Sequence, residues 1–426
     1  LLNLEISSAA FFKLIAFLEL YTSKSVILII FKVQLAIFIN IGVKNINMGE
    51  NNPFINIFKN KKLLISFIII IISLLLLNYF YVKNFKSLPS PLYGGDYYHQ
   101  LGAVEHIRAG GNFFVSPALN GEIPAYLPLY SIIIGTFAKL FNLSSLTSIL
   151  LFSYIFSVLS FILSFILAYK LFKDYLIAIA CALLFKLSLP FIILKYTPFG
   201  TAILVPLFLI LLYNFSENTN IKNSIYLGIC YGFIGLTHVI IFFAANLLLL
   251  FYSLYYVLFK NINLNKKLKI EFHIIKKSFL YLLLTIIIGI SISILWWYSP
   301  LFVFHGKTSI FIEHSLTPSY QFKTLFVFFK SIFFSFSSIK GFLSSLLSLL
   351  GIIGILFLKN SSKEIKFIKF LFISYVIIYS HYFITQNFFG FNFTPGYISD
   401  TYSIIPVLLA TLGISLFSDL SKKFKV

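Results

Sequence analysis

The chain has 426 residues, of which 59% are hydrophobic, 19% are aromatic and 11% are charged. This composition excludes an ordinary soluble globular protein, and several uncharged apolar runs of about 18 residues or more predict a polytopic α-helical membrane protein. The formal net charge is +20, but the lysines stand in short clusters between apolar runs, which indicates membrane topology and contact with lipid head groups, not nucleic-acid binding.

The first 47 residues fit the rest of the chain poorly. Residue 1 is leucine, and the only methionine is Met48. The segment before it is apolar but is interrupted by charged residues such as Lys13, Glu19 and Lys32, so it makes a poor membrane-spanning helix. We therefore expect residues 1–47 to be an over-extended start that is not part of the fold, with an additional membrane anchor as the alternative. Residues 48–426 are predicted to form a single transmembrane domain.

Ten membrane-spanning helices are predicted from Met48 onward. Lys59, Lys61 and Lys62 precede the first apolar run, so the positive-inside rule places them in the cytoplasm and directs that helix outward. Applied to the later loops, the same rule places both termini in the cytoplasm and makes the chain a multi-pass protein of the cell membrane. The apolar run 224–259 is too long for one span and is divided near His238. The other predicted spans are 63–82, 143–169, 175–194, 199–215, 278–298, 341–358, 370–385 and 401–417.

The long first external loop, residues 83–144, contains the most polar stretch of the chain. It carries Asp96, His99, Glu105, His106, Glu122 and the only arginine, Arg108. Gly94-Gly95 followed by Asp96 predicts the start of a helix with Asp96 at or near its N-cap, and Gly110-Gly111 predicts its end. A short apolar run over 126–140 begins with YLPLY, and we expect it to be a helix lying at the outer membrane interface.

Asp96 is the strongest candidate for a catalytic group. A carboxylate directly outside the first span, beside a Gly-Gly turn that allows close approach of a substrate, can serve as a general base; the alternative is that Asp96 only caps the helix. Asp96, His99 and His106 share one stripe of the predicted helix, and their oxygen and nitrogen atoms suit a divalent metal ion. That metal is the only cofactor that the sequence suggests, and the seven-residue spacing of the histidines is long for a site on one helix.

These features resemble the GT-C superfamily of integral membrane glycosyltransferases. A cytoplasmic N-terminus and one span lead to a long external loop that opens with Gly95-Asp96 and the aromatic pair Tyr97-Tyr98, and the PAYLPLY segment and serial spans follow. The superfamily includes the protein mannosyltransferases, the aminoarabinose transferases and the oligosaccharyltransferases. The resemblance implies a sugar donor on a polyprenyl phosphate or diphosphate, an acceptor on the extracytoplasmic face, and Asp96 in the catalytic-aspartate position. The superfamily's Asp-x-Asp or Asp-Glu pairing is absent, which leaves metal dependence open.

Several other residues are candidates for contact with the substrate. Arg108 can bind a phosphate bidentately, with pairing to Glu105 as the alternative. Lys186 lies in an apolar helix, where a charge is costly unless it faces a cavity, so it either reaches the donor phosphate or snorkels to the interface. His238 lies at the helix break, where it either caps a turn or contacts the substrate. The remaining candidates are His99, His106, Glu122, Glu313, His314 and Asp400.

Two other functions remain as alternatives to a glycosyltransferase. The first is a transporter or a flippase for lipid-linked saccharides, but such proteins tend to have paired repeats and charges within the membrane, whereas no repeat is found here and the charge is external. The second is a GT-C relative that has kept the fold and lost catalytic activity.

Overall fold

The computed structural model describes residues 61–83, 95–112, 127–189, 193–255, 272–298, 339–357, 362–380 and 401–424, together with Lys323 and Phe326. Two units are distinguished, Leu1–Ile69 and Ile70–Val426, and of the first only residues 61–69 are described. The predicted exclusion of residues 1–47 from the fold lies outside the described residues.

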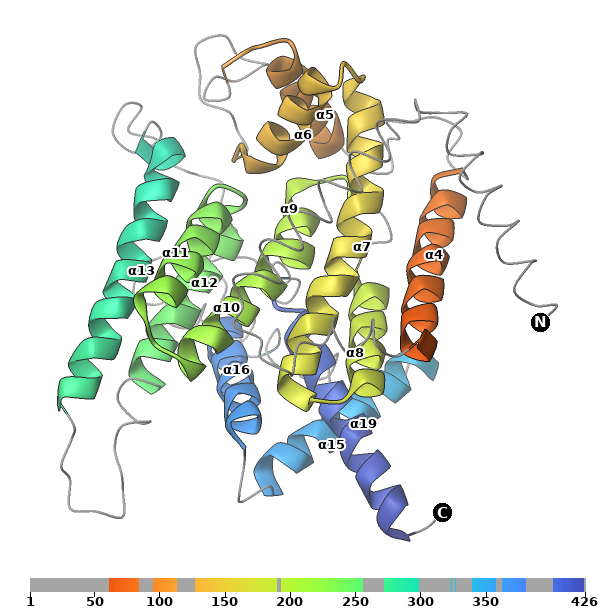
Figure 1. The fold of residues 1–426 in the computed structure, drawn as a ribbon, viewed down its shortest axis with the longest axis vertical. Coiled ribbons are helices and arrows are strands. Elements are labelled where there is room, and N and C mark those ends of the chain that lie inside the picture. Colours follow the sequence, from red (N-terminus) through yellow and green to blue (C-terminus); the bar gives the residue numbers. More distant parts are fainter. Residues whose placement is uncertain are drawn as a thin grey trace. The chain divides into compact units, whose positions relative to one another are not determined.

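All regular structure in the described part of the chain is helical (Figure 1). The helices are α4 (Lys61–Lys83), α5 (Gly95–Arg108), α6 (Leu129–Leu140), α7 (Ser145–Phe172), α8 (Tyr175–Ser188), α9 (Tyr196–Phe199), the π-helical turn η3 (Gly200–Leu204), α10 (Val205–Glu217), α11 (Ile221–Gly235), α12 (Val239–Tyr252), α13 (Phe272–Tyr298), α15 (Ile339–Phe357), α16 (Lys363–Tyr379) and α19 (Ile404–Phe424).

Four helices in the described part of the chain are long and apolar enough to cross a membrane, namely Leu63–Lys83, Ser145–Phe172, Tyr196–Glu217 and Lys277–Trp297. Shorter apolar helices include Leu129–Leu140, Tyr175–Ser188, Val239–Tyr255 and Ile404–Leu416. The prediction of an all-α polytopic membrane protein is thereby confirmed, and a helix is present within each of the ten ranges predicted as spans.

The observed helix ends differ from the predicted ones for local reasons. The third predicted span was drawn to residue 194, but α8 ends at Ser188 and Leu189 is extended, with φ −96° and ψ 161°. Leu189 directly precedes Pro190, and a residue before proline is disfavoured in the helical conformation. α16, which corresponds to the predicted span 370–385, begins at Lys363, seven residues earlier than predicted. Ser362 caps it by accepting a hydrogen bond from the Ile365 N–H at 3.4 Å.

The helix break near His238 is confirmed. α11 ends at Gly235, and α12 begins at Val239 with His238 as its N-cap residue. The His238 backbone is extended, and its Nδ1 accepts a hydrogen bond from the Ile240 N–H at 3.2 Å. Nδ1 is therefore the unprotonated nitrogen of a neutral ring, which leaves the proton on Nε2.

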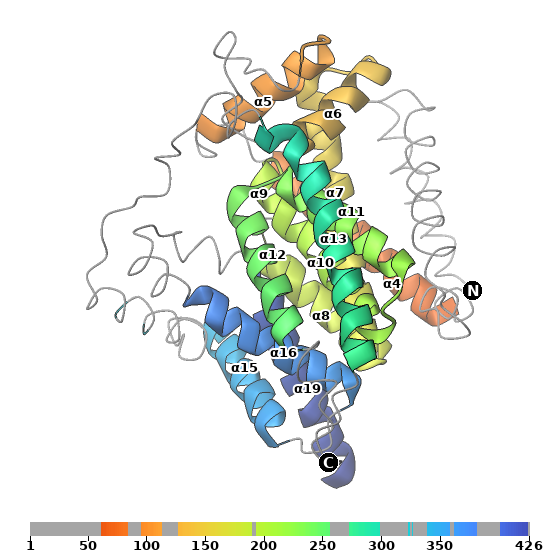
Figure 2. The same ribbon diagram turned by 90° about the vertical axis from the view of Figure 1, so that its left-hand side faces the viewer.

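Small residues allow α11 and α13 to pack closely. A β-carbon at Gly232 would lie 2.6 Å from Cβ of Ile292, so the two backbones approach at a distance that only glycine permits. Two α13 hydroxyls also bond to α11: Thr285 Oγ1 donates to the Ser224 carbonyl at 3.2 Å, and Ser293 Oγ donates to the Gly232 carbonyl at 3.3 Å. α11 and α13 run side by side in both views (Figures 1 and 2).

Candidate functional site

α5 is the helix that the sequence predicted between the two glycine pairs, and both of its ends are confirmed. It begins at Gly95, which makes Asp96 its second residue. At the other end Gly110 adopts φ +92°, the Gly110 N–H donates to the Ile107 carbonyl at 3.0 Å, and the Gly111 N–H donates to the His106 carbonyl at 2.8 Å. This pair of bonds is the Schellman motif, which favours glycine at the left-handed position.

One face of α5 is buried against α6. Its members follow a spacing of three, four and three residues, and each side chain is at most 9% exposed: Tyr97, Gln100, Val104 and Ile107. The two helices meet at Gly135 of α6, where a β-carbon would lie 2.7 Å from Cβ of Ile107 and 2.9 Å from the Val104 carbonyl oxygen. α5 is therefore held on α6 by direct backbone approach, and both lie next to the start of α7 (Figure 2).

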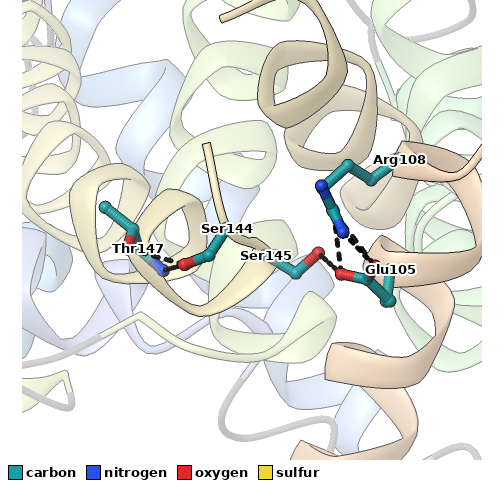
Figure 3. Close-up of polar contacts among 5 residues, drawn as sticks. All are labelled: Glu105, Arg108, Ser144, Ser145 and Thr147. Carbon is teal, nitrogen blue, oxygen red and sulfur yellow. Dashed lines mark hydrogen bonds and ion pairs between the residues drawn. The ribbon is translucent and has the colours of Figure 1, made fainter. Parts of the chain in front are cut away.

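An ion pair and a hydroxyl join α5 to the start of α7 (Figure 3). Arg108 donates to the Glu105 carboxylate through Nε, at 2.9 and 3.1 Å, and through Nη2, at 2.5 Å, while Ser145 Oγ donates to the same carboxylate at 2.5 Å. The hydrogen bonds from Arg108 and, next, from Ser145 hold the pKa of Glu105 below its usual value. We refer to Glu105, Arg108 and Ser145 as the α5–α7 clamp.

The α7 end of the clamp has its own helix cap. Ser144 precedes the first residue of α7, and its hydroxyl accepts a hydrogen bond from the Thr147 N–H at 3.1 Å (Figure 3). This satisfies one of the free N–H groups at the start of the helix. Ser145 is thereby fixed at the first position of α7, where its hydroxyl reaches Glu105.

The candidates on α5 do not form one cluster. Asp96 and Arg108 are twelve residues apart in a continuous helix, which separates their Cα atoms by about 18 Å along its axis. His106 Nε2 donates to the Asn112 carbonyl at 3.0 Å, within the same turn that ends the helix, and His99 is exposed. A joint role for Asp96 and Arg108 would require a ligand that extends along most of α5.

The metal-ligand set Asp96, His99 and His106 does not fit one ion. His106 lies ten residues after Asp96, a rise of about 15 Å, whereas metal–ligand bonds measure only about 2 Å. Within the described residues, no three histidine, cysteine or acidic side chains are placed to hold a metal ion.

The turn between α11 and α12 contacts three other helices, α6, α9 and α13. The Leu129 N–H, at the start of α6, donates to the Leu236 carbonyl at 3.0 Å, and Trp297 Nε1, near the end of α13, donates to the Gly235 carbonyl at 3.0 Å. The His238 ring is 9% exposed and stacks on Tyr196 of α9, with centroids 5.2 Å apart. His238 thus lies at the point where α6, α9 and α13 meet the α11–α12 turn.

Three polar side chains that are not among the predicted site residues are buried in α5 and α6: Tyr97, Gln100 and Tyr130, each 0% exposed. Burial raises the pKa of Tyr97 to about 12, with a smaller contribution from Tyr98. The Tyr130 ring packs against the Phe199 ring of α9, with the ring centroids 5.9 Å apart. The sequence signal that could have identified this group is Gln100, because it is a polar residue in the same helical stripe as Tyr97, Val104 and Ile107.

The other candidates are dispersed. Lys186 is 1% exposed and lies in the last turn of α8. Glu122, Glu313, His314 and Asp400 lie outside the described residues, as does the side chain of Asp96.

Comparison with solved structures shows which fold the chain resembles. The chain is similar to the crystal structure of ArnT from Cupriavidus metallidurans bound to undecaprenyl phosphate, with 14% sequence identity, a TM-score of 0.53, and coverage of 82% of this chain and 60% of that chain. It also matches the apo state of that ArnT (15% identity, TM-score 0.48, 82% of this chain and 59% of that chain). A further match is the Archaeoglobus fulgidus oligosaccharyltransferase in complex with Zn and sulfate (16%, TM-score 0.43, 76% and 45%). The likeness to ArnT makes the chain a GT-C-like membrane protein, which confirms the predicted resemblance at the level of the fold.

Sequence comparison gives the family. No family model matches the chain. The "Uncharacterized protein MJ1080" of Methanocaldococcus jannaschii is 43% identical over 98 residues, which are 23% of this chain and 73% of that protein. The chain belongs to the same family as MJ1080, and it spans about three fifths of the length of the ArnT chain that it resembles.

Proposed function

We propose that the protein is a membrane glycosyltransferase that moves a sugar from a polyprenyl-phosphate carrier to an acceptor on the extracytoplasmic face. The observation that carries the proposal is the place of Asp96 in the first turn of α5, the first helix after α4, in a GT-C-like fold. The ArnT structure of similar fold contains undecaprenyl phosphate, which supports a lipid carrier of that class for this chain.

In the proposed reaction, Asp96 is the general base. Its carboxylate takes the proton of an acceptor hydroxyl while the oxygen of that hydroxyl bonds to the anomeric carbon of the sugar. The bond between the anomeric carbon and the phosphate oxygen breaks, and the polyprenyl phosphate leaves with the electron pair. The polyprenyl chain stays in the bilayer, so the reacting atoms lie at the membrane surface, where the external loop can reach them.

The proposal includes an orientation. The lysines of this chain cluster in the loops that the predicted topology assigns to the cytoplasm, and the same topology assigns the acidic and histidine residues of 83–144 to the first loop on the other side. We infer a multi-pass protein of the cell membrane with both termini in the cytoplasm and with α5 and α6 on the extracytoplasmic side.

The test is sugar transfer by Asp96→Asn in proteoliposomes. The full chain is supplied with a panel of polyprenyl-phosphate donors carrying different labelled hexoses and with a membrane extract as the source of acceptors. Transfer from the donor that the wild-type protein uses should fall by about 10² to 10⁴-fold, which is the usual effect of losing a general base. The melting temperature should change little, because asparagine keeps the shape of aspartate and a carboxylate in the first turn of a helix contributes only about 0.3–1 kcal/mol through the helix dipole.

Asp174→Asn is the matched control. Asp174 caps α8 by accepting a hydrogen bond from the Ile177 N–H at 3.0 Å, and asparagine can keep that bond. This variant should melt and transfer sugar like the wild-type protein. An Asp96→Asn variant that transfers sugar as fast as the wild-type protein would show that Asp96 is not the general base. A wild-type protein that moves the lipid across the bilayer without transferring sugar would favour the flippase alternative.

A further inference from the structure

Among the described residues of α5 and α6, two buried side chains, Gln100 and Tyr130, have polar atoms without a hydrogen-bond partner. Gln100 is 0% exposed, and neither its amide oxygen nor its amide nitrogen bonds to any described residue. Tyr130, the second residue of α6, is also 0% exposed, and its hydroxyl is likewise unpaired within the described part of the chain. Native proteins satisfy the great majority of buried side-chain polar atoms, so two unsatisfied groups at one helix contact require an explanation.

Their position connects them to Asp96. Gln100 lies four residues, about one helical turn, after Asp96 on α5. Tyr130 is near Tyr97, since the Tyr97 phenol adds to the rise in the pKa of Tyr130 that burial causes. The Tyr130 ring also packs against Phe156 of α7 and Phe199 of α9, with ring centroids 6.3 and 5.9 Å apart. Both groups therefore lie in the packing of the N-terminal half of α5.

The chemistry of the two groups selects one part of the donor. A primary amide offers two N–H donors and a carbonyl acceptor, and a phenol offers one donor and one acceptor. A polyprenyl chain has no hydrogen-bonding atoms, and a phosphate is best bound by cationic groups. The hydroxyl groups of a sugar both donate and accept, as the amide and the phenol do.

We propose that Gln100 and Tyr130 recognise the sugar of the donor and distinguish the loaded carrier from the bare polyprenyl phosphate. This proposal depends on the glycosyltransferase function proposed above and names the residues that bind the sugar of the donor. Both side chains are closed to bulk water, so a sugar reaches them only when the start of α5 moves relative to α6. The hydrogen bonds formed there would also hold the sugar away from water during transfer.

The experiment compares lipid binding to the full chain in nanodiscs. The probes are the polyprenyl-phosphate hexose that the wild-type protein uses in the transfer assay and polyprenyl phosphate without a sugar. The wild-type protein should bind the hexose-bearing lipid more tightly. Gln100→Leu and Tyr130→Phe should each weaken binding of that lipid by about tenfold, the effect of losing one or two hydrogen bonds. Binding of the bare lipid should not change.

Thermal unfolding provides a second measurement. Removing a buried polar group that has no partner costs the folded protein no hydrogen bond, so neither variant should lower the melting temperature. Tyr231→Phe is the matched control, because the buried Tyr231 hydroxyl does donate to the Asn246 side chain. That variant should lower the melting temperature and leave lipid discrimination intact.

The outcomes separate this inference from the proposed function. If the wild-type protein prefers the hexose-bearing lipid and both variants keep the preference, the inference is wrong and the proposed function stands. The same conclusion follows if Gln100→Leu destabilises the protein as much as Tyr231→Phe does. If the wild-type protein neither transfers sugar nor binds either lipid, both proposals fail together.

Discussion

The contact with α6 at Gly135 holds the C-terminal half of α5, the helix that carries Asp96 in its first turn. A β-carbon at residue 135 would lie 2.7 Å from Cβ of Ile107, which is 0.7 Å inside the 3.4 Å at which ordinary contact begins, and 2.9 Å from the Val104 carbonyl oxygen. One of these neighbours is backbone and the other is a branched β-carbon, so neither can move without α5 itself. Gly135→Ala should therefore push α5 away from α6.

The magnitude follows from two opposing terms. Replacing a helical glycine by alanine stabilises a helix by about 0.5–1 kcal/mol, and overpacking a tight contact costs about 1–3 kcal/mol. We expect Gly135→Ala to lower the free energy of unfolding by about 1–2 kcal/mol. Because a displacement near 1 Å of a catalytic group costs about 10²-fold in rate, sugar transfer should fall further than the stability loss alone explains.

Gly102→Ala on α5 is the matched control. A β-carbon at residue 102 would meet nothing within 4 Å, so this variant should gain about 0.5–1 kcal/mol and keep full transfer activity. Both variants are measured by thermal unfolding in detergent and by transfer in proteoliposomes. The reasoning is refuted if Gly135→Ala melts at or above the wild-type temperature, or if the two variants change stability in the same direction.

Two further predictions concern the α5–α7 clamp and the α11–α12 turn. The lowered pKa of Glu105 means that its pairing with Arg108 stabilises the fold above the ordinary carboxyl pKa of 4.5, and that this stabilisation is lost as the pH falls. The difference in melting temperature between the wild-type protein and Glu105→Gln should therefore be largest near neutral pH and vanish in acid. A difference that is constant with pH would contradict the pairing. His238→Ala should lower the free energy of unfolding by about 0.5–2 kcal/mol through loss of the helix cap, whereas His238→Asn should preserve the cap. Equal destabilisation by both variants would show that capping is not the main role of the ring. A His238→Asn variant that is stable but does not transfer sugar would support contact of His238 with the substrate.

The positions of the helices were available from the sequence because they depend on local features. Runs of apolar residues marked the helices, and the pair Gly110-Gly111 marked the end of α5, because only the left-handed glycine conformation closes that turn well. The break at His238 was predicted from the excessive length of one apolar run. Where local chemistry was misjudged, the error was also local: Pro190 stops α8 before the predicted boundary.

The contents of the site depended on which helices pack together, and that is not a local property. The sequence left open whether Arg108 binds a phosphate or pairs with Glu105, and the structure shows the pair completed by Ser145, forty residues further along the chain. Likewise, nothing in the sequence distinguishes Gln100 from the other polar residues of the segment 83–144. Only the packing of α5 on α6 buries its amide, because the free energy of such contacts comes from surfaces that are distant in sequence.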